Sequence, residues 1–236
     1  METPVNAPIK EKIRIEFAKL REMTFKNKLD YIWEYYKFHI VCITIVLFII
    51  FSMLNLWIFN PRPDTVLFIS WNGGFATEDQ LKSLKDSLEE RLIPEGENEE
   101  VVIAQFFLSS DDPAMNMAEL QRTAAMLAAG TIDFFIVNSE LLEQYSRFGY
   151  FMPLENVLTI IQSKNPEAYR RIEENVVTAD FEIEEGVREN LSAGIKIGNS
   201  PLFLKHGLYR QDIYISIAAT TNQLDNIIEA LILFFE

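Results

Sequence analysis

An uncharged apolar stretch from His39 to Phe59 constrains this chain more than any other feature of its sequence. Its 21 residues contain no Asp, Glu, Lys or Arg. Because an α-helix rises about 1.5 Å per residue, the stretch would span about 30 Å, which is the thickness of a bilayer's hydrocarbon core. A helix also satisfies its own backbone hydrogen bonds, as a lipid environment requires. The stretch therefore predicts a single transmembrane helix.

Two other interpretations of the stretch fit less well. A buried core helix of this length would normally carry a polar stripe, and this one has none. A cleaved signal peptide has a short basic leader and small residues at its cleavage site. Here 38 residues precede the stretch, and its end is filled by bulky Leu54, Leu56, Trp57, Ile58 and Phe59. We therefore expect an anchor that is not cleaved.

Charge is distributed unevenly about the apolar stretch. Residues 1–59 hold eight basic and six acidic residues, a net charge of +2, whereas residues 60–236 hold 13 basic and 29 acidic residues, a net charge of −16. The acidic excess argues against binding to nucleic acid or to anionic lipid. Basic residues lie shortly before the stretch and only Arg62 lies shortly after it. The positive-inside rule therefore predicts a cytoplasmic N-terminus at the cell membrane and residues 60–236 outside.

The only cysteine, Cys42, lies inside the apolar stretch. The segment after the stretch can form no internal disulfide, which is ordinary for a Gram-positive bacterium and unusual for a eukaryotic ectodomain. We interpret Cys42 as a membrane-buried apolar thiol, since it lacks the small neighbours of a lipoprotein cleavage site. The expected parts are a partly helical cytoplasmic segment (1–38), the transmembrane helix (39–59) and an extracytoplasmic α/β domain (60–236).

The cytoplasmic segment has helical periodicity over residues 10–23 and again over residues 25–38. Thr24 could cap the second of these helices, whose aromatic residues fall where the headgroups meet the hydrocarbon. Two arrangements remain open for this second helix. It is either an amphipathic helix on the inner leaflet or a continuation of the anchor helix into the cytoplasm.

Beyond residue 63, short apolar runs alternate with amphipathic segments. The predicted strands are 65–71, 101–108, 132–137, 193–197 and 213–219. The predicted helices are 77–92, 113–129, 140–148, 154–162, 166–175 and a last one capped by Thr221 or Asn222. The acidic segment 180–189 is expected to be mostly surface. This alternation predicts right-handed crossovers and a mostly parallel sheet in one three-layer α/β domain.

Residues 124–158 (AAMLAAGTIDFFIVNSELLEQYSRFGYFMPLENVL) resemble a stretch of bacterial extracellular solute-binding proteins. In that family a helix ending in Ala-Gly-Thr is followed by an Asp-led strand, a short helix, a Gly-aromatic turn and a Leu with an acidic neighbour. The matching residues here are Ala129, Gly130, Thr131, Asp133, Gly149, Tyr150, Phe151, Leu154 and Glu155. Residues 214–235 are similar to the family's closing strand and helix. Residues 28–40 resemble leaders of uncharacterised single-pass membrane proteins of Gram-positive bacteria.

The resemblance implies a fold like one lobe of a periplasmic binding protein. Solute-binding proteins close two lobes on their ligand. Only about 50 residues separate Leu158 from Ile213, which is too few for a second α/β lobe. We therefore expect a reduced, single-lobe domain that is anchored by the membrane helix in place of a lipid.

Ligands of open parallel sheets bind beyond the carboxyl ends of the strands. The predicted loops there supply these candidate ligand-binding residues: Asn72, Gly73, Gly74, Ser109, Ser110, Asp111, Asp112, Asn138 and Ser139. Backbone N–H groups at the helix N-termini could bind an anion, and the two aspartates could bind a cation or an amine. The other interpretation is that all of these residues are turn glycines and helix caps, which any such loop needs.

No sequence pattern points to catalysis or to a cofactor. The chain has no dinucleotide fingerprint, Walker loop, HExxH motif, paired-histidine metal spacing or nucleophile elbow. Of the two histidines, His39 lies at the membrane edge and His206 near a predicted turn, where a surface or capping role is expected. The sequence therefore predicts no enzyme activity, no cofactor and no metal site.

These observations predict a membrane-anchored binding domain that recognises a small solute or a neighbouring envelope protein. Without a second lobe, contact with a protein is the better supported of the two. The alternatives are an accessory or sensory subunit of a membrane transporter and an extracytoplasmic hydrolase. A polar cluster in a deep pocket would favour the hydrolase, and a shallow apolar-rimmed surface would favour a protein interface.

Overall fold

The structure is a computed structural model of the whole chain. It describes residues 8, 14–15, 17–18, 21, 23–59, 61–106, 113–184 and 186–236. The chain divides into two compact units, Met1–Arg62 and Pro63–Glu236. Most of the helix predicted over 10–23 lies outside the described residues, and so do the candidate residues Ser109, Ser110, Asp111 and Asp112.

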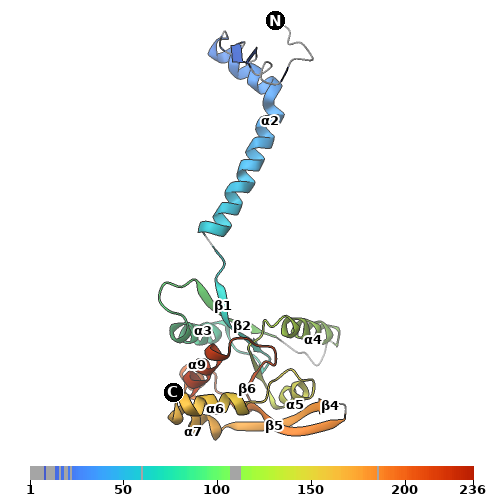
Figure 1. Cartoon of the computed structure of the whole chain (residues 1–236), viewed down its shortest axis with the longest axis vertical. Coiled ribbons are helices and arrows are strands. Elements are labelled where there is room, and N and C mark those ends of the chain that lie inside the picture. Colours follow the sequence, from blue (N-terminus) through green and yellow to red (C-terminus); the bar gives the residue numbers. More distant parts are fainter. Residues whose placement is uncertain are drawn as a thin grey trace. The chain divides into compact units, whose positions relative to one another are not determined.

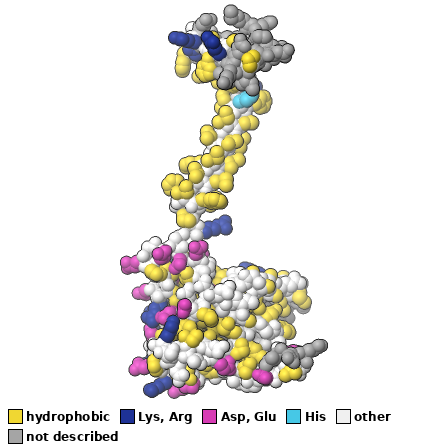
Figure 2. Space-filling view, in the orientation of Figure 1, with side chains coloured by type: hydrophobic (Ala, Val, Ile, Leu, Met, Phe, Trp, Pro, Cys, Tyr) yellow, Lys and Arg dark blue, Asp and Glu magenta, His cyan; other side chains and the backbone are white. Residues whose placement is uncertain are grey.

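The first unit contains one long helix. Helix α2 runs from Phe25 to Leu54 and continues as a π-helical turn, η1, from Asn55 to Phe59. None of its residues is buried, and hydrophobic side chains follow it along its length (Figure 2). Together the two elements are long and apolar enough to cross a membrane. The aromatic segment 25–38 and the predicted anchor form one helix, which agrees with the second of the two arrangements left open by the sequence.

The second unit is built on a single mixed sheet of six strands in the order β2-β1-β3-β6-β5-β4 (Figure 1). In that order the strands are Glu99–Gln105, Asp64–Trp71, Phe134–Val137, Tyr214–Ile217, Val187–Lys196 and Val176–Glu184. The β1 strand pairs in parallel with β2 and β3, whereas the three other pairings are antiparallel. The prediction of a mostly parallel sheet is therefore not confirmed.

A missed hairpin explains part of this difference, and the rest comes from β6, which runs antiparallel to both β3 and β5. The acidic segment that we expected to be mostly surface contributes to β4 and β5, which fold back on each other at Gly186. Gly186 has a φ of +82°, a conformation that glycine adopts without steric cost. Strands joined by so short a turn must run antiparallel. The segment was misread because its outward-facing residues are charged, while Ala179 and Phe181 of the same strand are buried.

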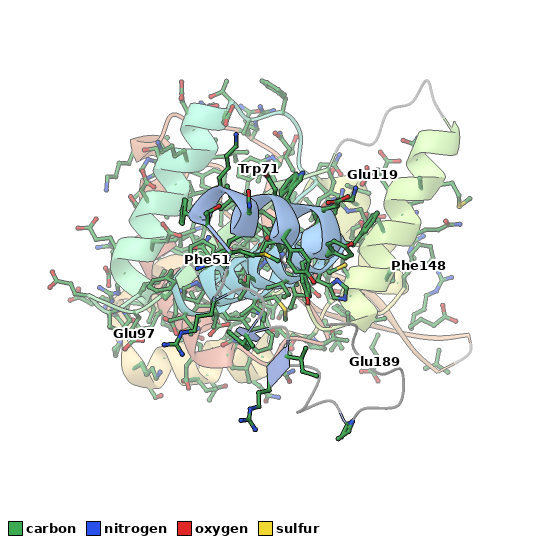
Figure 3. The ribbon with its side chains drawn as sticks, turned by 90° about the horizontal axis from the view of Figure 1, so that it is seen from above. Phe51, Trp71, Glu97, Glu119, Phe148 and Glu189 are labelled. Atoms are coloured by element: carbon green, nitrogen blue, oxygen red, sulfur yellow. The ribbon has the colours of Figure 1, made fainter. Side chains whose placement is uncertain are left out.

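Helices cover both faces of the sheet and make three layers. On one face lie α3, α6, α7, α8 and α9, which are Glu78–Leu92, Glu155–Lys164, Pro166–Glu173, Pro201–Lys205 and Leu224–Phe235. On the other face lie α4 and α5, which are Pro113–Ala128 and Ser139–Arg147. Figures 1 and 3 both show α3 and α4 on opposite sides of this unit. Each face of the sheet packs its own apolar cluster, so alternate residues of β3 belong to different clusters.

Several helices begin or end at residues with ordinary capping chemistry. Thr77 and Gln80 form a reciprocal capping box at the start of α3. The turns after α4 and α5 contain Gly130 and Gly149, both with positive φ, which is typical of helix ends. The last helix differs: its N-cap is Gln223, not Thr221 or Asn222. Thr221 instead donates a hydrogen bond from its hydroxyl to the buried Asp133.

Candidate functional site

The predicted strand-end loops meet at one edge of the sheet. The backbone N–H of Asn72 donates to the carbonyl of Ile136 at 2.7 Å, which joins the end of β1 to the end of β3. Gly73 lies against this junction, because a Cβ atom placed on it would be 3.3 Å from the carbonyl carbon of Val137. The structure therefore brings the Asn72–Gly74 loop next to the loop that holds Asn138 and Ser139.

The polar groups of these two loops hold the turns together. The Oδ1 atom of Asn72 accepts a hydrogen bond from the Ser70 hydroxyl at 2.8 Å, and the Oδ1 atom of Asn138 caps α5 by accepting from the N–H of Leu141 at 2.9 Å. The carbonyl of Gly74 accepts from Trp71 Nε1 at 2.6 Å and from Gln105 Nε2 at 3.0 Å. These contacts are those of caps and turns, and a ligand-binding role for the loops stays a prediction.

A groove of about 820 Å³ adjoins the Asn72–Gly74 loop and lies between α3 and the edge strand β2. Its lining combines apolar side chains with four charged ones. The lining residues are Phe75, Ala76, Glu78, Leu81, Lys82, Lys85, Glu100, Val102, Ile103 and Gln105. Phe75 is 61% exposed and stands at its side, although an aromatic residue normally buries most of its surface. We call this feature the α3–β2 groove.

Backbone polar groups of β2 face outward along the groove. In a parallel pair, alternate residues of a strand bond to the same neighbour. The carbonyl of Asn98 accepts from Asp64, and the N–H of Phe106 donates to Trp71, so the even-numbered residues of β2 bond to β1. Val101, Ile103 and Gln105 therefore direct their N–H and C=O groups away from β1. A free strand edge of this kind is a template for another strand.

One half of this edge is blocked within the protein. A carboxylate oxygen of Glu89 on α3 accepts a hydrogen bond from the N–H of Val101 at 3.0 Å. The Lys85 ammonium lies 3.4 Å from Glu89 and 3.6 Å from Glu100, which places a small charge network over the start of β2. The rest of the lining opposite the strand combines the apolar Phe75, Ala76 and Leu81 with the charged Glu78 and Lys82.

Two polar clusters lie outside the groove. Both ring nitrogens of His206 hydrogen-bond serine hydroxyls of α3, Nδ1 to Ser83 at 2.7 Å and Nε2 to Ser87 at 3.1 Å. Burial, together with the nearby Lys205 charge, lowers the pKa of His206 below its ordinary value. Among the described residues no carboxylate hydrogen-bonds this imidazole, so the cluster lacks the third member of a nucleophilic triad. It ties the segment after α8 to α3.

The second cluster is centred on Asp133, which is buried at the start of β3. Its carboxylate accepts hydrogen bonds from the N–H of Phe68 at 2.8 Å and from the hydroxyl of Thr221 at 2.5 Å. Burial raises the pKa of Asp133, and these two hydrogen bonds oppose that rise. Asp133 thus joins three separate segments of the chain and has the contacts of a structural residue.

Comparison with known proteins found no relative of this chain: no protein-family model, curated protein or solved structure matches it. Among the described residues, no three His, Cys, Asp or Glu side chains lie together in a way that could hold a metal ion.

The α3–β2 groove was missed by sequence reasoning. The strand at 101–108 was predicted, but nothing in its residues indicates that it lies at the edge of the sheet. The four acidic residues at positions 95, 97, 99 and 100 were the available signal, because charged residues often protect an exposed edge.

Proposed function

We propose that this protein is a single-pass membrane protein whose α/β domain lies outside a bacterial cell and binds a partner protein at the α3–β2 groove. The groove is the observation that carries the proposal. It follows an edge strand, its lining is largely apolar, and Phe75 and Leu81 are accessible from solvent. An accessible apolar surface beside an edge strand suits contact with another polypeptide.

The anchor and its orientation rest on charge. A helix whose uncharged stretch 39–59 is long enough to cross a bilayer precedes the domain. The basic residues close to that stretch lie mostly on its N-terminal side, and only Arg62 lies shortly after it. The domain's own net charge of −16 is compatible with the outer side, where attraction to anionic inner-leaflet lipid is not required. Figure 2 shows acidic side chains mainly along the left and lower sides of the domain in this view.

A small solute is a less suitable ligand than a protein. Small-molecule sites usually bury most of their ligand in a concavity, which solute-binding proteins achieve by closing two lobes. The domain has one sheet, and the side-chain oxygens of Asn72 and Asn138 in its strand-end loops already accept hydrogen bonds within the fold. If a solute is bound, the residues to consider remain Asn72, Gly73, Gly74, Asn138 and Ser139.

Membrane orientation can be tested with single cysteines in a Cys42→Ala background. We expect a membrane-impermeant maleimide to label Gln211→Cys in intact cells, and to label Lys26→Cys only after the cells are permeabilised. Both wild-type residues are exposed. The reverse pattern would refute the proposed topology.

Solute binding can be tested on the full chain in lipid nanodiscs. Thermal unfolding is recorded with amino acids, sugars, oligopeptides, polyamines and metal ions, because a ligand of the native state raises the melting temperature. We expect no saturable shift with an amino acid, a sugar, a polyamine or a metal ion. A saturable shift with an amino acid, sugar, polyamine or metal ion would overturn the choice of a protein partner.

A further inference from the structure

We propose that the α3–β2 groove takes an extended, uncharged segment of the partner protein, which adds as a further strand beside β2. This inference rests on the partner-binding function proposed above and specifies how that partner is held. It follows from three properties of the groove: its backbone groups, its side chains and its charge.

The backbone groups define a short pairing site. The C=O of Val101, the N–H and C=O of Ile103 and the N–H of Gln105 all point away from β1. Glu89 already occupies the N–H of Val101, so an added strand would pair with the second half of β2 and not with its start. Strand addition gains its affinity from such main-chain hydrogen bonds.

The side chains of the groove define what the segment carries. Successive residues of an added strand point to opposite faces of the sheet. Every second side chain would therefore enter the space between β2 and α3, which is lined by Leu81, Ile103 and Phe75. We expect apolar residues at those positions and polar residues at the alternate ones, because the other face of this edge is only partly covered.

The charge of the groove selects an uncharged segment. Glu78 and Glu100 are balanced by Lys82 and Lys85, so the groove is neutral although the domain carries a net charge of −16. A basic segment would gain from the domain as a whole but would meet both lysines in the groove. A second copy of this chain is a poorer occupant, since two domains of −16 repel each other.

The probe for this inference is a display library of random octapeptides. It is selected against the full chain in nanodiscs, and synthetic copies of the enriched peptides are then titrated. We expect enriched sequences with apolar residues at every second position. N-methylation of the peptide backbone should weaken binding about tenfold or more at alternate residues and little at the others, because only alternate residues of a paired strand bond to β2. An effect without this period of two would overturn strand addition.

A protein variant tests the same contact from the other side. Ile103→Pro removes the outward N–H at residue 103 and leaves the even-numbered groups that bond to β1. We expect it to abolish peptide binding while the domain stays folded with a lower melting temperature, because the Ile103 side chain also packs against the core, whereas Ile103→Val should bind normally. If Ile103→Pro unfolds the domain, the N-methylated peptides titrated against the wild-type protein still show whether the peptide binds by strand addition.

The outcomes separate this inference from the proposed function. Enrichment of no octapeptide would overturn strand addition, while the orientation and solute tests would leave partner binding standing. Enrichment of peptides whose binding is unaffected by Ile103→Pro and by N-methylation would also overturn it. A saturable solute shift would instead overturn the partner-binding function itself.

Discussion

The carboxylate of Glu89 in α3 accepts a hydrogen bond from the backbone N–H of Val101 in β2 at 3.0 Å. The two residues are twelve positions apart, and the bond crosses from a helix to the outer edge of the sheet. A side chain from α3 thus takes the position that a neighbouring strand would otherwise occupy. This contact ends the accessible part of the edge and sets where the α3–β2 groove begins.

Replacement of Glu89 should therefore destabilise the domain. We expect Glu89→Ala to cost about 1 kcal/mol of unfolding free energy, the usual worth of one hydrogen bond, and to lower the melting temperature by about 2–4 °C. The Lys85 ion pair adds little, because it is partly exposed. Glu89→Gln keeps an acceptor and should lie closer to wild type. Glu90→Ala, an exposed neighbour, is the matched control. Equal effects at positions 89 and 90 would contradict the role of the bond.

Asp133 should be one of the least replaceable polar residues of the domain. Asp133→Ala would leave the buried N–H of Phe68 and the hydroxyl of Thr221 without their acceptor. We expect a loss of about 2–4 kcal/mol in unfolding free energy, measured by denaturant titration in detergent. Asp133→Asn retains one acceptor oxygen and should lose less. If the alanine variant were as stable as the asparagine variant, the two hydrogen bonds would not contribute as inferred.

His206 should make stability depend on pH. Its pKa is lowered below 6.5 in the folded protein, so the unfolded chain takes up the proton first as pH falls. The contribution of the neutral imidazole is thus fully present above pH 6.5 and is lost as the pH falls through the folded-state pKa. We expect the melting temperature of wild type to fall relative to His206→Gln between pH 8 and pH 5. The expectation would be refuted if the difference in melting temperature between wild type and His206→Gln stayed constant with pH. It would also be refuted if the difference grew in favour of wild type at low pH.

The apolar helix should tolerate apolar but not charged replacements. Arginine near the middle of a transmembrane helix costs about 2.5–3.5 kcal/mol per residue for insertion. We expect the double variant Val46→Arg, Ile49→Arg to be released from membranes by alkaline carbonate, because both side chains would face hydrocarbon. Val46→Leu, Ile49→Leu is the control and should stay in the pellet. Retention of the arginine variant would argue against a transmembrane position for this helix.

Much of the fold was predictable because it depends on neighbouring residues. Local patterns account for the apolar stretch and for the strands β1, β2 and β3. They also account for the capping box at Thr77 and for the glycines that end α4 and α5. Such patterns act over a few residues, so one sequence is enough to detect them. The function that follows from the domain, and a ligand role for the strand-end loops, stay predictions.

Tertiary structure alone decided which strands meet and which polar residues come together. For the edge position of β2 the sequence held only an indirect signal, the acidic residues at its start, and nothing indicated that Glu89 binds the N–H of Val101. It also did not indicate the pairing of His206 with two serines more than a hundred positions away. Strand order and direction depend on how all the apolar faces pack at once. The β4–β5 hairpin supplies one antiparallel pairing, and β6, which runs antiparallel to both of its neighbours, supplies the other two. The sequence by itself determined a long apolar helix and an α/β domain. Only long-range packing determined where that domain has an accessible edge.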